Sequence, residues 1–193
     1  MLPWYVPDFE PPFLSGQLLL SMPGMADPRF ARVVIAMCVH DENGALGLVV
    51  NQPMPGLSVP ELMRTLEIDP QATPERPVLN GGPVEPSRGF VLHSPDYEGE
   101  STIMVGMKWG LTATLDVLRD IAAGKGPSRW LSTLGYTGWG PGQLESEMAS
   151  HGWQQAPGDT RLIFDTPVEA RWEQAFAGLG INVGQLSATP GRA

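Results

Sequence analysis

The residues of this chain best suited to chemistry are a cysteine and a histidine two positions apart. Cys38 is the only cysteine, and His40 follows it after Val39. The apolar run that contains the cysteine predicts a β-strand, and residues two apart on a strand share a face. A thiol beside an imidazole can form a nucleophilic thiolate, and His93 could serve as a further base or orienting group. Cys38, His40 and His93 are therefore the candidate catalytic residues of a thiol-dependent enzyme or redox sensor.

The same spacing also has a purely structural interpretation. Free cysteine in an apolar strand usually behaves as a small buried hydrophobe, and His40 stands where the following turn begins. A metal site is not predicted, because a closed zinc site needs about four ligands and both His93 and His151 would have to join the pair. The pattern alone leaves open whether Cys38 is buried or reactive.

A second group of candidates surrounds a glycine-rich turn. Asn80-Gly81-Gly82 could present consecutive backbone N–H groups to an anion, or the glycines could simply meet the demands of a tight turn. Asn51 ends a predicted strand and could contribute a side-chain amide. Asn51, Asn80, Gly81 and Gly82 are therefore candidate ligand-binding residues, provided that the fold brings them to one cavity with Cys38, His40 and His93.

No cofactor motif is complete. Gly124-Lys125-Gly126 lacks the upstream glycine and the following serine or threonine of a phosphate-binding loop. Gly178, Gly180 and Gly184 follow a helical pattern instead of joining a strand to a helix, as a dinucleotide site requires. Neither a Gly-x-Ser-x-Gly elbow nor a His-Glu-x-x-His motif occurs. The sequence therefore predicts no cofactor and no metal.

The elements that must position these candidates form an irregular series of strands and helices. The strands at 32–39 and 45–51 form a hairpin around Asn43-Gly44, a strong turn signal. Ser58 and Glu61 have the spacing of a capping box and predict a helix start. Further strands are predicted at 17–22, 78–79, 89–93, 101–105, 129–134 and 161–164, and helices at 58–66, 112–123, 141–150 and 166–179. Few helices cross over between strands, which favours an α+β fold with a mixed or mainly antiparallel sheet and about four helices.

The predicted organisation is a single domain with two appendages. Residues 1–15 are rich in proline and show no period, so they predict an N-terminal arm. Residues 16–183 hold all the predicted elements, and residues 184–193 predict a flexible tail.

Charge argues against two classes of partner. Lysine and arginine number 12 against 21 aspartates and glutamates, a net charge of −9, and the basic residues are scattered. Nucleic-acid affinity depends largely on basic groups that neutralise phosphates, and anionic membranes attract basic segments in the same way. No apolar run approaches the length of a membrane span, and the N-terminus lacks signal-peptide features. We therefore expect a cytoplasmic protein that binds neither nucleic acid directly nor membranes.

Several ordered motifs resemble the YqgE/AlgH family of bacterial proteins. They include Met22-Pro23-Gly24-Met25, Asp27-Pro28-Arg29-Phe30, Cys38-Val39-His40, Gly81-Gly82-Pro83-Val84 and Gly138-Trp139, and the resemblance runs from about residue 13 to 190. It implies a compact α+β fold with a strongly curved sheet and a cytosolic protein, and it supplies no established catalytic residues. Some members are described as transcriptional regulators, a role that we expect to be indirect here because of the charge.

The leading hypothesis is therefore a non-enzymatic regulatory or binding protein that acts through an unknown protein partner or a small ligand. The alternative is the thiol-dependent enzyme or redox sensor centred on Cys38 with His40.

Overall fold

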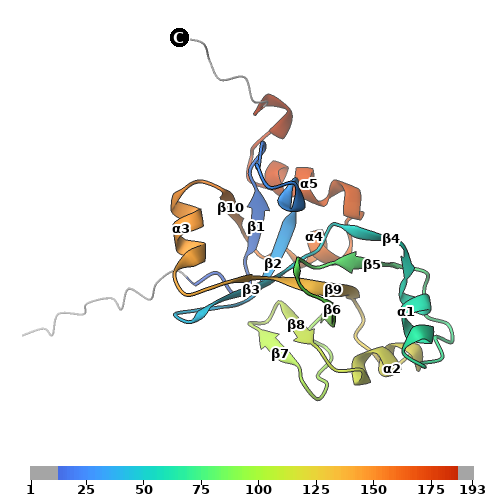
Figure 1. Cartoon of the computed structure of the whole chain (residues 1–193). Helices are drawn as coiled ribbons and strands as arrows, with labels where there is room; N and C mark the ends of the chain where they lie inside the picture. The colour runs from blue at the N-terminus through green and yellow to red at the C-terminus, as the bar shows by residue number, and fades with distance from the viewer. Residues whose placement is uncertain (1–12, 187–193) are drawn as a thin grey trace, which may run out of the picture.

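A computed structural model describes residues 13–186 of the chain (Figure 1). The strands are β1 (Leu18–Ser21), β2 (Val34–Asp41), β3 (Gly44–Val49), β4 (Pro53–Ser58), β5 (Pro77–Asn80), β6 (Val84–His93), β7 (Ile103–Val105), β8 (Trp109–Thr112), β9 (Trp130–Trp139) and β10 (Trp153–Ala156). The α-helices are α1 (Val59–Thr65), α2 (Asp116–Ala122), α3 (Gln143–Ala149), α4 (Thr160–Phe164) and α5 (Arg171–Gly178). Three short 3₁₀ helices are η1 (Pro28–Phe30), η2 (Val168–Ala170) and η3 (Val183–Gln185).

The strands form one curled sheet with the order β10-β1-β2-β3-β9-β6-β8-β7. All of these neighbours are antiparallel, whereas β5 pairs in parallel with β9 and carries β4 on its other side. The expected α+β class, the single domain and the curved, mainly antiparallel sheet are confirmed, with five α-helices among residues 13–186 where about four were expected.

Strand β9 lies in the middle of the sheet and joins its two halves. Its last residues, 137–139, pair with β3, and its first half pairs with both β6 and β5. In Figure 1 it runs through the centre of the molecule, with α3 near one end and α1 and α2 near the other. Residues distant in sequence therefore meet along β9.

Strand β2 is buried on both faces, as its apolar composition predicted. Val34, Ala36 and Cys38 belong to a large core that also contains Trp109 and the helices α4 and α5. Ile35 and Met37 belong to a second core beneath α3. The hairpin from β2 to β3 also forms, with Asp41 paired to Gly44.

Two predictions of local structure are wrong. Residues 161–164 form helix α4 and not a strand, because the Asp159 side chain accepts hydrogen bonds from the N–H groups of Arg161 and Leu162 and thereby caps a helix. The predicted helix at 112–123 begins later, because Leu111 and Thr112 complete strand β8 against β6 and α2 starts at Asp116.

The predicted boundaries fall partly outside the described residues. Residues 1–12 of the proposed arm and 187–193 of the proposed tail are not described. Leu14, which the prediction assigned to the arm, is buried in the core beneath α3, and η3 continues past residue 183 to Gln185. Over residues 13–186, no helix is long and apolar enough to span a membrane.

Candidate functional site

A β-bulge separates the two residues that the sequence placed side by side. Met37 pairs with Gly47 and Val39 pairs with Leu46, so Cys38 is the extra residue on its strand. A bulge of one residue reverses which face the following side chains occupy. Cys38 lies in the large core, whereas His40 faces Leu14 and α3 on the other side. The expectation that Cys38 and His40 share a face is therefore wrong.

The Cys38 thiol is sealed in the large core. It is 3% exposed, and its sulfur contacts the Ala36 carbonyl at 3.6 Å. Burial raises the pKa of Cys38 to about 12 and outweighs the neighbouring Trp109 indole, which acts in the opposite direction. A thiol in these surroundings is neither ionised nor reachable at neutral pH.

His40 is used for structural hydrogen bonds at both ring nitrogens. Its Nδ1 accepts a hydrogen bond from the Leu14 N–H at 2.9 Å, so the proton is on Nε2, which donates to the Glu145 carboxylate at 2.9 Å. The ring is buried and packs edge-on against Phe13. His40 thus ties the segment before β1 to helix α3 and keeps no nitrogen free for catalysis.

His93 is also fully engaged. Its Nδ1–H donates to the Ser94 carbonyl at 2.8 Å, and its Nε2 accepts from the Thr112 hydroxyl at 2.8 Å. The ring is completely buried, and this burial lowers the pKa of His93. It therefore stays neutral and links β6 to β8. With both ring nitrogens engaged, it has none free to act as a base for Cys38.

The glycine-rich turn is used to join strands. The Gly81 N–H donates to the Leu134 carbonyl at 2.8 Å, and the Gly82 N–H donates to the Asn80 side chain at 3.2 Å. A Cβ atom on Gly81 would lie 2.3 Å from the Gly135 carbonyl oxygen, so glycine is needed for this close approach to β9. Neither N–H is left for an anion, so of the two interpretations of this turn the hydrogen bonds support the structural one.

Asn51 is likewise a structural residue. Its side chain accepts a hydrogen bond from the Val34 N–H at 2.9 Å and donates to the Arg32 carbonyl at 2.8 Å. None of the sequence candidates lines the main recesses among residues 13–186, and they do not meet in one of these cavities. Over residues 13–186, no group of three or more His, Cys, Asp or Glu residues is placed to hold a metal ion.

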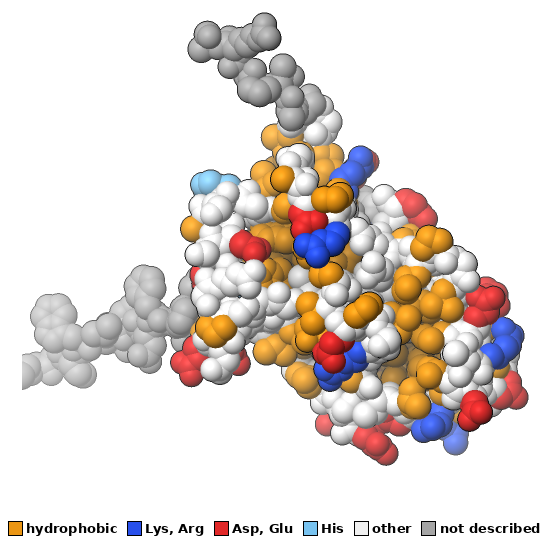
Figure 2. Space-filling view, viewed as in Figure 1, with side chains coloured by type: hydrophobic (Ala, Val, Ile, Leu, Met, Phe, Trp, Pro, Cys, Tyr) orange, Lys and Arg blue, Asp and Glu red, His pale blue; other side chains and the backbone are white. Residues whose placement is uncertain are grey.

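A recess with a volume of about 480 Å³ lies between η1, α3, β9 and the start of β10. We call it the aromatic recess. It is lined by Met25, Asp27, Arg29, Phe30, Pro83, Val84, Thr137, Gly138, Trp139, Gln143, Ser146, Glu147, Ser150, Gly152 and Trp153. Figure 2 shows the face of the molecule viewed as in Figure 1, on which lysines and arginines stand apart from one another among acidic and neutral side chains.

Three aromatic rings form a row in this recess. The Phe30 ring meets Trp153 edge-to-face at 5.7 Å, and Trp153 meets Trp139 in the same manner at 6.2 Å. Phe30 belongs to η1, Trp139 ends β9 and Trp153 begins β10. Edge-to-face pairs of this kind are stabilising and hold the rings in fixed orientations.

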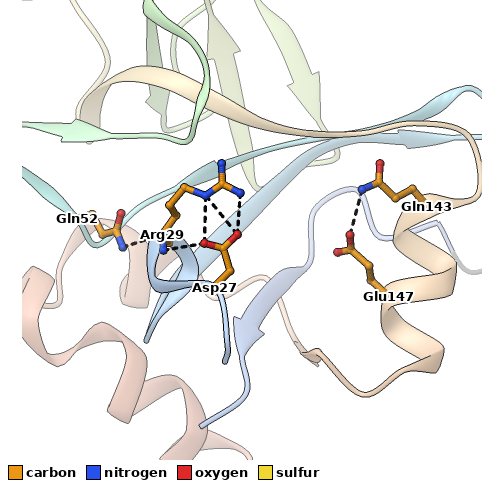
Figure 3. A network of polar contacts seen from close by, with 5 residues as sticks. All are labelled: Asp27, Arg29, Gln52, Gln143 and Glu147. Atoms are coloured by element: carbon orange, nitrogen blue, oxygen red, sulfur yellow. Dashed lines mark hydrogen bonds and ion pairs between the residues drawn. The ribbon is translucent and has the colours of Figure 1, made fainter. Parts of the chain in front are cut away.

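Glu147 fixes both tryptophans. Its Oε2 accepts hydrogen bonds from the indole N–H groups of Trp139 and Trp153, each at 2.9 Å, and its Oε1 accepts one from Gln143 at 3.1 Å. Gln143 and Glu147 are drawn in Figure 3 on helix α3. No cationic group of residues 13–186 lies within 4.0 Å of the Glu147 carboxylate, so its charge is unpaired.

Asp27 and Arg29 form a bidentate ion pair on the other side of the recess (Figure 3). The Arg29 guanidinium donates to both Asp27 oxygens, at 2.7 Å in the shortest contact, and the Arg29 backbone N–H also donates to this carboxylate. These hydrogen bonds from Arg29 lower the pKa of Asp27. The two charges compensate each other, which leaves Glu147 as the uncompensated charge of the recess.

The sequence contained only a weak signal for this site. Trp139 and Asp27-Pro28-Arg29-Phe30 stood out only within the family resemblance. Trp153 and Glu147 carried no signal, because the contacts among these segments are not local.

Comparison with known proteins settles the family. The model of the family described as AlgH-like matches residues 18–184. The chain belongs to the AlgH-like family. Among its AlgH-like relatives, a "UPF0301 protein" of Rhizorhabdus wittichii is 55% identical over 183 residues, which cover 95% of this chain and 98% of the relative. Another, from Sphingopyxis alaskensis, is 50% identical and covers 96% and 100%.

Two solved structures share the fold. The solution structure of AlgH from Pseudomonas aeruginosa has a TM-score of 0.78 at 42% identity, covering 95% of this chain and 97% of that one. Protein DIP2367 from Corynebacterium diphtheriae has a TM-score of 0.74 at 18% identity, covering 91% and 92% of the two chains. The second likeness shows the fold alone.

Proposed function

We propose that this AlgH-like chain is a non-enzymatic regulatory protein of the cytoplasm that binds a basic segment of a partner protein in the aromatic recess. The observation that carries the proposal is the Glu147 carboxylate, which has no cationic partner among residues 13–186 and is bonded to two tryptophans in a row of three aromatic rings. Oε1 of Glu147 has one hydrogen-bond partner within residues 13–186 and can accept another. A lysine or arginine side chain that enters the recess would meet this oxygen and the aromatic rings together.

The charge of the chain supports a basic partner. A net charge of −9 accelerates association with positively charged proteins and opposes association with nucleic acid. An effect on transcription would then be indirect, through the bound protein. The alternative of a thiol-dependent enzyme receives no support from the structure, because Cys38 is buried and separated from His40.

The indole N–H groups of Trp139 and Trp153 provide a test, because each gives its own signal in a ¹⁵N-labelled sample. The probes are two capped peptides of equal length, one with lysines and leucines and the other with glutamates in place of the lysines. We expect the lysine peptide to shift both indole signals and the glutamate peptide to shift neither.

Glu147→Gln keeps a carbonyl oxygen for the indoles and removes the charge, and Glu75→Gln removes the same charge from an exposed position outside the recess. We expect the lysine peptide to bind the Glu147 variant about tenfold more weakly and the Glu75 variant almost normally. Equal shifts with both peptides, or unmoved indole signals with the lysine peptide, would overturn the proposal.

A further inference from the structure

A second recess contains a buried arginine with no acidic partner. Arg171, the first residue of α5, is 7% exposed, and among residues 13–186 no carboxylate lies within 4.0 Å of it. Burying a charge is costly unless an opposite charge or hydrogen bonds compensate it. The nearby Glu169 is exposed and acts only through its field, and burial lowers the pKa of Arg171 to about 10. The guanidinium is therefore an unbalanced positive charge inside the fold.

The hydrogen bonds of Arg171 leave part of its guanidinium unused. Nε donates to the Thr166 carbonyl at 3.0 Å, and Nη1 donates to the Val50 carbonyl. Nη2 has no acceptor in residues 13–186, yet it is not among the sealed polar atoms that lack a partner. Nη2 is therefore not fully enclosed, and Arg171 lines a recess with a volume of about 330 Å³.

A second arginine lines the same recess, which we call the arginine recess. The Arg76 guanidinium lies over the Trp130 ring at 4.6 Å and donates to the Trp130 carbonyl at 3.1 Å, and it also lacks an acidic partner within residues 13–186. The remaining lining is Pro77, Leu79, Leu131, Ser132, Ile163, Phe164 and Val168. It contains no acidic residue, in a chain whose acidic residues outnumber the basic ones by 21 to 12.

We propose that the arginine recess binds a small organic carboxylate. The acid group pairs with Arg171 and Arg76, because a planar guanidinium matches a carboxylate in charge and in hydrogen-bond geometry. The hydrocarbon or aromatic body of the ligand lies against the apolar wall formed by Leu79, Leu131 and Phe164. A recess of this size, lined by apolar residues and by two arginines, suits a ligand of modest size. This site is separate from the aromatic recess, with no lining residue in common.

The test compares 4-phenylbutyrate with its neutral amide and with inorganic phosphate, each at millimolar concentration with the full-length protein. Binding is followed by the backbone N–H signals of α4 and of Arg76, Val78 and Leu79 in ¹⁵N-labelled protein. We expect the carboxylate to shift these signals in a saturable way and to bind about tenfold more tightly than either comparison compound.

The matched variants are Arg76→Gln and Arg64→Gln, which remove one positive charge each from exposed positions inside and outside the recess. We expect Arg76→Gln to weaken carboxylate binding about three- to tenfold and Arg64→Gln to leave it unchanged. Arg171→Lys retains the charge without the planar fork, and its binding should weaken at least as much as that of Arg76→Gln.

Three outcomes would refute the proposal. If the amide binds as well as the acid, the arginines do not recognise the ligand. If phosphate alone binds as well as the acid, the apolar wall takes no part. If the acid shifts no signal, the recess is not a carboxylate site. None of these results bears on the lysine peptide and the two indole signals, so the two proposals fail independently.

Discussion

Replacing Glu147 by alanine should destabilise the protein through the two tryptophans that it holds. The substitution removes the shared acceptor of both indole N–H groups, each of which is bonded at 2.9 Å. Trp139 is 6% exposed and Trp153 is 7% exposed, so water can replace the carboxylate only in part. A buried donor left without a partner costs about 1–3 kcal/mol, and partial access of water places each indole in the lower half of that range. The free energy of unfolding should therefore fall by about 2–4 kcal/mol, which for a chain of this size lowers the Tm by about 4–16 °C.

Two variants calibrate this loss. Glu147→Gln keeps one carbonyl oxygen that can accept from both indoles and loses only the charge, so we expect a cost of about 1 kcal/mol. Ser146→Ala lies on the same helix at an exposed position, and its hydroxyl makes no hydrogen bond within residues 13–186, so we expect a change within about 0.5 kcal/mol. Urea unfolding followed by tryptophan fluorescence measures all three. A Glu147→Ala variant as stable as Ser146→Ala would refute the view that the carboxylate holds the two rings.

Three further predictions concern the strand junction, the thiol and pH. Gly81→Ala should lower the free energy of unfolding, measured in urea, by at least about 3 kcal/mol, since its Cβ would meet a backbone oxygen of β9 at 2.3 Å. Gly178→Ala in α5 is the control. Its Cβ would have nothing within 4 Å, so it should be neutral or slightly stabilising. Burial raises the pKa of Cys38 to about 12. A disulfide reagent at neutral pH should therefore label Cys38 about a thousandfold more slowly in the native protein than in urea. Equal rates would show that the core opens around this thiol. The hydroxyl of Ser94, and then the side chain and N–H of Ser128, lower the pKa of Asp96. Protonation of Asp96 on acidification therefore opposes folding. The stability that Asp96 contributes is complete above the ordinary carboxyl pKa of about 4 and is lost as the pH falls through the lower folded-state pKa. Asp96→Asn should flatten this part of the curve of stability against pH.

Hydrogen bonds from buried polar side chains also hold separate segments of the chain together. His40 joins Leu14 to Glu145, and Arg171 joins the end of β3 to the segment before α5. The two contacts of His40 and the contact of Arg171 with Val50 link segments far apart in the sequence, whereas Thr166 lies only five residues before Arg171. They fasten helices and connecting segments to the curled sheet.

Local signals in the sequence were sufficient for elements that depend on neighbours along the chain. The Asn43-Gly44 turn forms because its residues tolerate the backbone of a tight hairpin, and Ser58 caps α1 with Glu61 in the predicted reciprocal manner. The burial of both faces of β2 follows from its unbroken apolar composition. The α+β class followed from the irregular order of these elements.

The tertiary structure alone decided the site. One extra residue at Cys38 shifted the register of β2 against β3 and sent His40 to the opposite face, which no spacing of two residues can reveal. The aromatic recess joins Phe30, Trp139 and Trp153 from η1, β9 and β10, and the arginine recess joins Arg76 to Arg171. Periodicity reports which face of an element is apolar, whereas strand register and the meeting of distant segments arise from packing over the whole chain.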